Sequence, residues 1–254
     1  MRNVAVIFSI FFLSAMAFGQ QPAPTTPSPD DIARRSVDLL GGSTAWQQAR
    51  YLSYTFNVQK DGKVVASFPQ KWDRVAGIYQ VSGRTIDGVP FDATINIKTK
   101  KVHGSIQGRA VRDNPELYQL AYTRFLNDTF WLLMPLKMFD PGVRRTYEGP
   151  RSDTCGRTWD LLKLTVAEDQ GAGLTPGDVY WPWINRDTGM VEEWDMKLQN
   201  MRPDDPPVEV LFHDYRRIAG LLISVRREVR GKGQIVRLDD LQILPEVPKG
   251  AFKN

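Results

Sequence analysis

The chain has 254 residues, of which 42% are hydrophobic, 24% are charged and 11% are aromatic, and its formal net charge is +4. This composition excludes a wholly disordered, collagen-like or coiled-coil protein. One cysteine, Cys155, excludes a disulfide scaffold and a structural zinc cluster, since both need several cysteines, and two histidines leave little material for a metal site.

The first nineteen residues have the three parts of a secretory signal peptide. Arg2 gives a basic start, and residues 4–13 form an apolar run that is too short to span a bilayer comfortably. Small residues follow, and cleavage after Ala17 or after Gly19 fits them equally well. An uncleaved membrane anchor is the alternative. We expect an exported mature chain, located in the periplasm or outside the cell, whose net charge falls from +4 to +3 because only Arg2 is removed.

Residues 20–29 contain four prolines among polar residues, which predicts a flexible linker. Residues 30–254 are expected to form a single domain. Its Lys and Arg residues are scattered among acidic ones, which argues against the clustered basic stripe of a nucleic-acid-binding protein.

The domain begins with a predicted helix over residues 30–40, which an aspartate can cap and which Gly41-Gly42 ends. From Tyr51 the apolar residues alternate with period two, and Asp61-Gly62 predicts a tight hairpin turn. Further strands are expected at residues 51–59, 63–72, 77–82, 91–98, 101–107, 157–166, 178–184, 190–198, 208–215, 221–230 and 234–244.

A second helix is predicted from Pro115 to about Asp128, followed by the apolar segment 130–134, which Pro135 interrupts. The whole pattern predicts a mainly β (α+β) fold. We expect a curved antiparallel sheet or incomplete β-barrel of about ten or eleven strands, with two or three helices over its open side. The strands do not alternate with helices, which disfavours a parallel dinucleotide-binding sheet.

Catalytic signatures are absent from the sequence. Cys155 has no neighbouring base, and His213 and Asp214 are expected on opposite faces of a strand. The adjacent carboxylates of Glu192-Glu193 and Asp239-Asp240 should also point to opposite faces, and the third pair, Asp204-Asp205, lies in a proline-rich loop. We therefore expect no enzyme activity, no cofactor and no metal site.

Aromatic residues gather in the segments 130–134 and 179–183. They are either the core of a sheet or the wall of a cavity that suits an apolar ligand. On the second interpretation, the candidate lining residues are Phe125, Phe130, Trp131, Met134, Trp181, Trp183 and Trp194.

Two stretches resemble the LolA/LolB-like lipoprotein carriers, known as outer-membrane lipoprotein-sorting proteins. The first consists of residues 127–137 (NDTFWLLMPLK) and 140–143 (DPGV). The second consists of residues 179–181, 187–191, 212–216 and 218–221. The resemblance implies a curved sheet with helices plugging its open side and a hydrophobic cavity that can hold acyl chains. It implies no catalytic residues.

These observations favour an exported, periplasmic carrier or binding protein for a lipid-like or other apolar ligand, with envelope lipoprotein or lipid trafficking as one role. The partners would be that ligand and an envelope protein or lipoprotein, with no nucleic acid and only transient membrane contact. A non-catalytic structural or interaction domain of the envelope is the second hypothesis. An exported hydrolase with an unrecognised site is the third.

Overall fold

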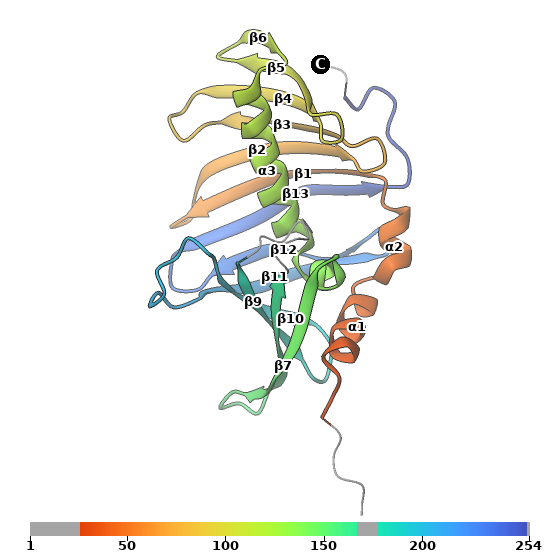
Figure 1. The fold of residues 1–254 in the computed structure, drawn as a ribbon, viewed down its shortest axis with the longest axis vertical. Coiled ribbons are helices and arrows are strands. Elements are labelled where there is room, and N and C mark those ends of the chain that lie inside the picture. Colours follow the sequence, from red (N-terminus) through yellow and green to blue (C-terminus); the bar gives the residue numbers. More distant parts are fainter. Residues whose placement is uncertain (1–25, 167–176, 253–254) are drawn as a thin grey trace, which may run out of the picture.

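The computed structural model describes residues 26–166 and 177–252. Within them, thirteen antiparallel strands form one sheet in the order β6-β5-β4-β3-β2-β1-β13-β12-β11-β10-β9-β8-β7 (Figure 1). The predicted mainly β class is confirmed, whereas the predicted number of strands is too low. The expected signal peptide and residues 20–25 of the expected linker lie outside the described residues.

The sheet is built from two meanders, each of which follows the order of the sequence. The first contains β1 (Tyr51–Lys60), β2 (Lys63–Asp73), β3 (Ile78–Arg84), β4 (Pro90–Asn96), β5 (Lys101–Ile106) and β6 (Arg109–Arg112). The second contains β7 (Val143–Ser152), β8 (Thr158–Val166), β9 (Val179–Asn185), β10 (Val191–Lys197), β11 (Val208–Ile218), β12 (Leu221–Val229) and β13 (Gln234–Leu244). The meanders join where β1 pairs with β13, from Tyr51 opposite Leu244 to Lys60 opposite Gln234.

The two strands that the sequence pattern misses are β6 and β7, which lie at the two edges of the sheet. β6 has only four residues and none of them is buried. In β7 only Val143 is buried, and a bulge between Tyr147 and Gly149 interrupts its pairing with β8. Edge strands bury little apolar surface, so the alternation that identifies the central strands is weak in them.

Three α-helices are described: α1 (Pro29–Leu39), α2 (Gly42–Gln48) and α3 (Pro115–Leu133). Asn114 caps α3 by accepting the Leu117 amide at 2.7 Å. The helix runs past the expected end near Asp128 and through the apolar segment. It then tightens into the 3-10 helix η1 (Met134–Phe139), which contains Pro135. No helix of the described residues is both long and apolar enough to cross a membrane.

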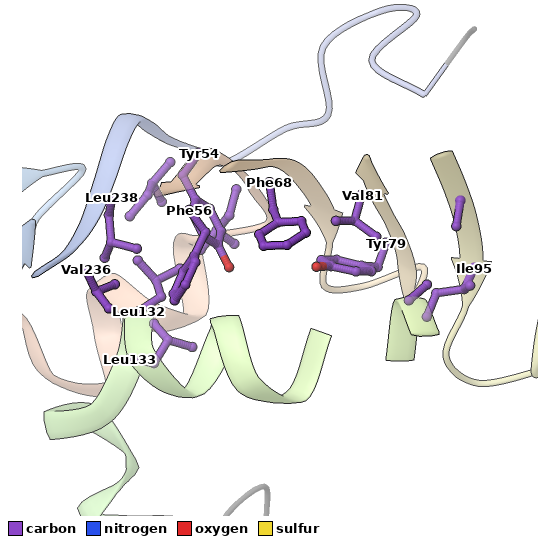
Figure 2. Packing of buried hydrophobic residues seen from close by; sticks show 14 of the residues in the cluster. Tyr54, Phe56, Phe68, Tyr79, Val81, Ile95, Leu132, Leu133, Val236 and Leu238 are labelled. Carbon is purple, nitrogen blue, oxygen red and sulfur yellow. The ribbon is translucent and has the colours of Figure 1, made fainter. Parts of the chain in front are cut away.

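α3 crosses one face of the sheet, which we call the α3 face, and the hydrophobic core lies between them (Figures 1 and 2). On this face Tyr54, Phe56 and Phe68 point towards Leu132 and Leu133 of the helix (Figure 2). A second cluster lies under α1 and η1 and contains the fully buried Trp194. We call the opposite side of the sheet the outer face.

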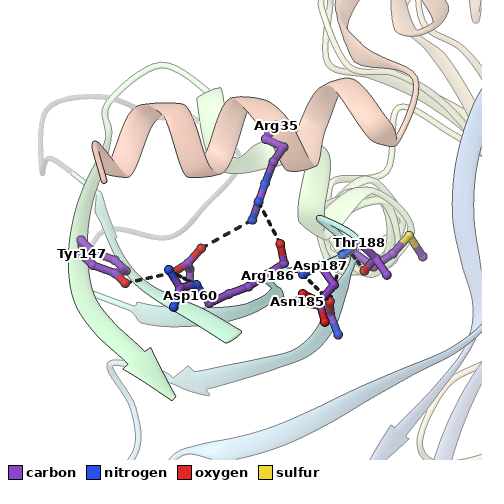
Figure 3. A network of polar contacts seen from close by, with 8 residues as sticks. Arg35, Tyr147, Asp160, Asn185, Arg186, Asp187 and Thr188 are labelled. Carbon is purple, nitrogen blue, oxygen red and sulfur yellow. Dashed lines mark hydrogen bonds and ion pairs between the residues drawn. The ribbon is translucent and has the colours of Figure 1, made fainter. Parts of the chain in front are cut away.

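A polar cluster fixes α1 to the second meander (Figure 3). The buried carboxylate of Asp160 accepts a hydrogen bond from Tyr147 Oη at 2.9 Å and pairs with Arg35 at 3.5 Å and with Arg186 at 3.2 Å. The neighbouring hairpin loop ends at Gly189, whose φ of +77° lies in the left-handed region that favours glycine. These contacts hold the helix in place and leave Asp160 fully occupied.

Candidate functional site

The four candidate lining residues on α3 and η1 point towards the sheet and are packed against other side chains. The ring centroid of Phe125 lies 5.1 Å from that of Trp72 and 5.2 Å from that of Tyr79. Phe130 lies 5.4 Å from Tyr180, Trp131 contacts both core clusters and Met134 is fully buried. Their ligand contact stays a prediction.

The other three candidates are divided between the two faces of the sheet. Trp194 lies opposite Pro182 in the pairing of β9 with β10, is fully buried and belongs to the core. Trp181 and Trp183 flank Pro182 on β9. Because neighbouring side chains of a strand alternate, they lie on the outer face. The structure thus does not bring the seven candidates together around one space.

A buried polar network lies between α3 and the first meander. The carboxylate of Asp128 is 0% exposed and accepts hydrogen bonds from Arg124 and Gln70, and Gln70 in turn accepts one from Tyr79 Oη at 2.7 Å. Burial raises the pKa of Asp128, and the Arg124 guanidinium opposes this rise. The guanidinium also lies 3.9 Å from the centre of the Phe68 ring.

A groove of about 730 Å³ opens beside Arg124, at the end of the sheet that carries the β1–β2 and β3–β4 turns. We call it the hairpin groove. Its inner part contains Val58, Ala66 and Phe68, which belong to or pack against the core of the α3 face. Its rim carries exposed aliphatic side chains, and these are Val64, 55% exposed, Val65, 62% exposed, and Ile86, 102% exposed.

Local backbone features shape the hairpin groove. Val65 forms a bulge, because Val58 pairs with Ala66 while the next residue of β1 pairs with Val64. Gly83 lies under the Phe68 ring, and a Cβ there would be 2.4 Å from the Cδ1 atom of that ring. The only sequence signal for this site is the Val64-Val65 pair, which breaks the alternation of a strand next to its turn.

A second groove, of about 810 Å³, lies on the outer face, and we call it the acidic groove. Trp159 and Trp183 line it, together with the carboxylates of Glu192, Glu193, Asp195 and Glu209. Trp159 Nε1 donates to Glu192 at 2.7 Å and Trp183 Nε1 donates to Asp195 at 2.9 Å. Among the described residues, no three potential ligand side chains are placed to hold a metal ion.

The acidic groove corrects one sequence prediction. Glu192 and Glu193 are adjacent on β10 and were expected on opposite faces, yet both line this groove. The reason is an irregularity in the pairing of β10 with β9 between Val191 and Glu193, which turns both carboxylates outwards. Such a bulge depends on the partner strand, so alternation along β10 alone does not indicate it.

Crowding of carboxylates in the acidic groove alters their titration. The pKa of Asp195 is raised to about 7, chiefly by burial and also by the charges of Glu193 and Glu209, against the hydrogen bond from Trp183. Burial also raises the pKa of Glu193, although Arg230 bridges Glu193 and Glu209 at 2.6 Å to each. Asp195 therefore changes its charge near neutral pH.

Comparison with known proteins gives low similarity throughout. No protein-family model and no curated protein matches the chain. Among solved structures, MucB matches with 12% identity and a TM-score of 0.27, over 89% of this chain and 62% of that one. The Mycobacterium tuberculosis lipoprotein LppX matches with 12% identity and a TM-score of 0.32, over 84% of this chain and 96% of that one.

A third match is the MucA/MucB complex of Pseudomonas aeruginosa, with 14% identity and a TM-score of 0.23, over 87% of this chain and 61% of that one. The chain thus spans less than two thirds of the MucB chains it matches. With TM-scores below 0.5 these matches support no conclusion about binding or catalysis, which rests on the chain's own residues.

Proposed function

We propose that the chain is an exported, non-catalytic binding or carrier protein that holds a lipid-like or other apolar ligand in the hairpin groove. The observation that supports this most directly is the exposure of Val64, Val65 and Ile86 around an opening that leads to Phe68. Aliphatic side chains gathered at a groove mark a surface that is covered in use. In this proposal the sheet and α3 are the walls of an incomplete barrel.

The size and chemistry of the groove fit part of an acyl chain. A volume of about 730 Å³ lies within the range of small-molecule sites. Each methylene removed from water contributes about 0.8 kcal/mol, so about eight of them contribute on the order of 6 kcal/mol before the entropy of association is subtracted. The signal-peptide pattern suggests that this carrier works in the periplasm or outside the cell, where an envelope protein or lipoprotein would be its partner.

The test is a titration of the purified mature protein with a fluorescent apolar probe, with native mass spectrometry to detect lipid that copurifies. Ala66→Phe fills the groove and Ile86→Ser removes an apolar rim contact, so both are expected to weaken binding severalfold. Val75→Ser is the control, because Val75 is also an exposed aliphatic residue but lies at the β2–β3 turn, at the opposite end of the sheet.

Two outcomes would contradict the proposal. Wild-type protein that binds no apolar probe and carries no lipid would leave the structural or interaction domain as the better hypothesis. Equal loss of binding in Ile86→Ser and Val75→Ser would show that the probe adheres to exposed valine and isoleucine in general and not to the hairpin groove.

A second candidate function is hydrolysis in the acidic groove, and one observation favours it. Glu193 and Asp195 lie two residues apart on the same face of β10 and line the same groove, and a carboxyl group with a pKa of about 7 can donate or accept a proton at neutral pH. A panel of chromogenic ester, phosphate and glycoside substrates tests this candidate. Asp195→Asn should abolish any turnover, whereas Asp239→Asn, on β13, should not; a wild-type rate equal to that of buffer rejects it.

A further inference from the structure

We propose that the ligand of the hairpin groove is an anionic amphiphile, whose carboxylate or phosphate group pairs with Arg84 and is flanked by Arg124. This inference rests on the proposed function and narrows its ligand class. It is carried by the distribution of charge around the groove, which the binding of a purely apolar molecule would not require.

The charged side chains that line the hairpin groove are both arginines, Arg84 and Arg124, and no carboxylate lines it. The acidic groove on the outer face has the opposite character, with six carboxylates and two arginines in its lining. The chain as a whole carries 33 basic and 29 acidic residues, so an arginine-only lining is a local property and not a reflection of composition. Its positive charge complements an anionic head group.

Arg84 is the free cation of the pair. It lies at the end of β3, is exposed and donates one hydrogen bond from Nη1 to the carbonyl of Gly88 at 2.7 Å, which holds it over the β3–β4 turn. No carboxylate of the described residues forms an ion pair with it. A guanidinium has five N–H donors arranged to bind a carboxylate or phosphate through two oxygens, so most of its donors remain for a ligand.

Arg124 lies between the groove and the buried network behind it. Its Nε and Nη2 atoms are occupied by Asp128, and its guanidinium covers the Phe68 ring. Its side chain is 20% exposed and contributes to the lining of the groove. Because Asp128 balances its charge, Arg124 contributes hydrogen bonding near the apolar wall while Arg84 contributes the net charge.

This arrangement orients an amphiphile. The chain would lie along Val58, Ala66 and Phe68, where it escapes water, and the anionic group would remain at the rim beside Arg84. A fatty acid and a lipid with a phosphate group both have this chemistry. Inorganic phosphate has the charge without the chain, and a fatty alcohol has the chain without the charge, so each isolates one half of the proposal.

The experiment is competition between a bound fluorescent apolar probe and three unlabelled ligands, namely dodecanoate, dodecanol and inorganic phosphate. On the wild-type protein we expect dodecanoate to compete about three- to fivefold better than dodecanol at low salt and phosphate not to compete. Dodecyl phosphate in a parallel titration shows which of the two anionic groups binds more tightly. The preference should fall as NaCl is added.

Three variants test whether Arg84 causes the preference for dodecanoate. Arg84→Gln should reduce the preference for dodecanoate to about one while leaving dodecanol binding unchanged, and Arg84→Lys should keep most of the preference. Arg144→Gln is the control, because Arg144 is an exposed arginine on β7, at the opposite edge of the sheet. It should behave like the wild type.

The outcomes separate this inference from the proposed function. Equal binding of dodecanoate and dodecanol to the wild type, or an unchanged preference in Arg84→Gln, overturns the anionic ligand and leaves an apolar carrier. If inorganic phosphate alone displaces the probe, the groove binds an anion and does not need an acyl chain. This result also overturns the anionic amphiphile as the ligand. Failure of both amphiphiles to bind overturns the proposed function itself.

Discussion

The guanidinium of Arg227 donates a hydrogen bond from Nη2 to the backbone carbonyl of Leu132 at 3.3 Å, at the C-terminal end of α3. Arg227 is 1% exposed and its guanidinium lies 4.7 Å from the centre of the Phe212 ring. Burial lowers the pKa of Arg227 to about 10, so it is charged at neutral pH. The partial negative charge of the helix end takes the place of a carboxylate partner.

Two substitutions separate the charge of Arg227 from its volume. Arg227→Ala leaves a cavity and an unsatisfied carbonyl, so we expect the free energy of unfolding to fall by about 2–4 kcal/mol. Arg227→Met fills most of the space without a buried charge and should cost less than about 1.5 kcal/mol. Urea unfolding followed by circular dichroism measures both, and equal losses would show that the charge, and not the packing, is the main contribution.

Trp194 is expected to matter for stability and not for ligand binding. It is fully buried, so Trp194→Ala should lower the free energy of unfolding by about 3–5 kcal/mol. Trp181 lies on the other face and is partly exposed, so Trp181→Ala should cost less than half as much. Binding of an apolar probe to the still-folded Trp194→Phe protein should match the wild type; a severalfold loss would instead place the ligand beside this ring.

Gly104 is expected to tolerate no side chain. A Cβ at this position of β5 would lie 2.1 Å from the backbone carbonyl oxygen of Asp92 on β4, so Gly104→Ala should force the strands apart and cost on the order of 2–4 kcal/mol. In the β5–β6 turn, Gly108→Ala meets no atom and is strained only by its φ of +75°, at about 1 kcal/mol. In thermal unfolding, Gly104→Ala should therefore have a clearly lower melting temperature than Gly108→Ala.

Because the pKa of Asp195 is raised, replacing its carboxyl group should stabilise the folded protein by an amount that depends on pH. The folded protein holds this proton up to about pH 7, whereas the unfolded chain releases it near pH 4, so folding loses free energy as the pH rises between these values. Asp195→Asn should match the wild type at pH 4 and exceed its stability at pH 8, by on the order of 1–3 kcal/mol. Glu193, Glu209 and Arg230, which face Asp195, are retained in the variant.

Asp239 provides the control, because replacing its carboxylate should change the stability in the opposite direction. Burial raises the pKa of Asp239, but hydrogen bonds from Arg237 and Asn57 outweigh this effect and hold the pKa below its usual value. Its contribution to stability is therefore present at neutral pH and lost as the pH falls through the folded pKa. Asp239→Asn should be less stable than the wild type at pH 7, and parallel pH profiles for the two variants would contradict the assignment.

Local patterns in the sequence predict most of the fold. Alternation with period two and turns such as Asp61-Gly62 indicate eleven of the thirteen strands in the described part of the chain, because the central strands bury one face and expose the other. The edge strands β6 and β7 bury too little to show the pattern. The end of α3 is missed because the apolar residues at 130–133 continue the helix until Pro135 stops it.

The candidate site is much less predictable, because it depends on contacts between distant segments. The aromatic residues that stand out in the sequence are mostly used in packing, as Trp194 and Phe125 show. Both grooves instead depend on bulges, at Val65 and beside Glu193, which arise from the register between two strands. A single sequence indicates where each strand lies, but it does not indicate which residues of two neighbouring strands pair with each other.

The pairing of β1 with β13 has a consequence for the order of folding. Each meander contains contacts between neighbouring strands only and can form from a short stretch of chain, whereas the central ladder joins the first strand to the last. During synthesis β1 therefore has an open edge until residue 244 is available. The middle of the finished sheet is the part completed last, and a chain truncated before β13 would leave two half-sheets with no ladder between them.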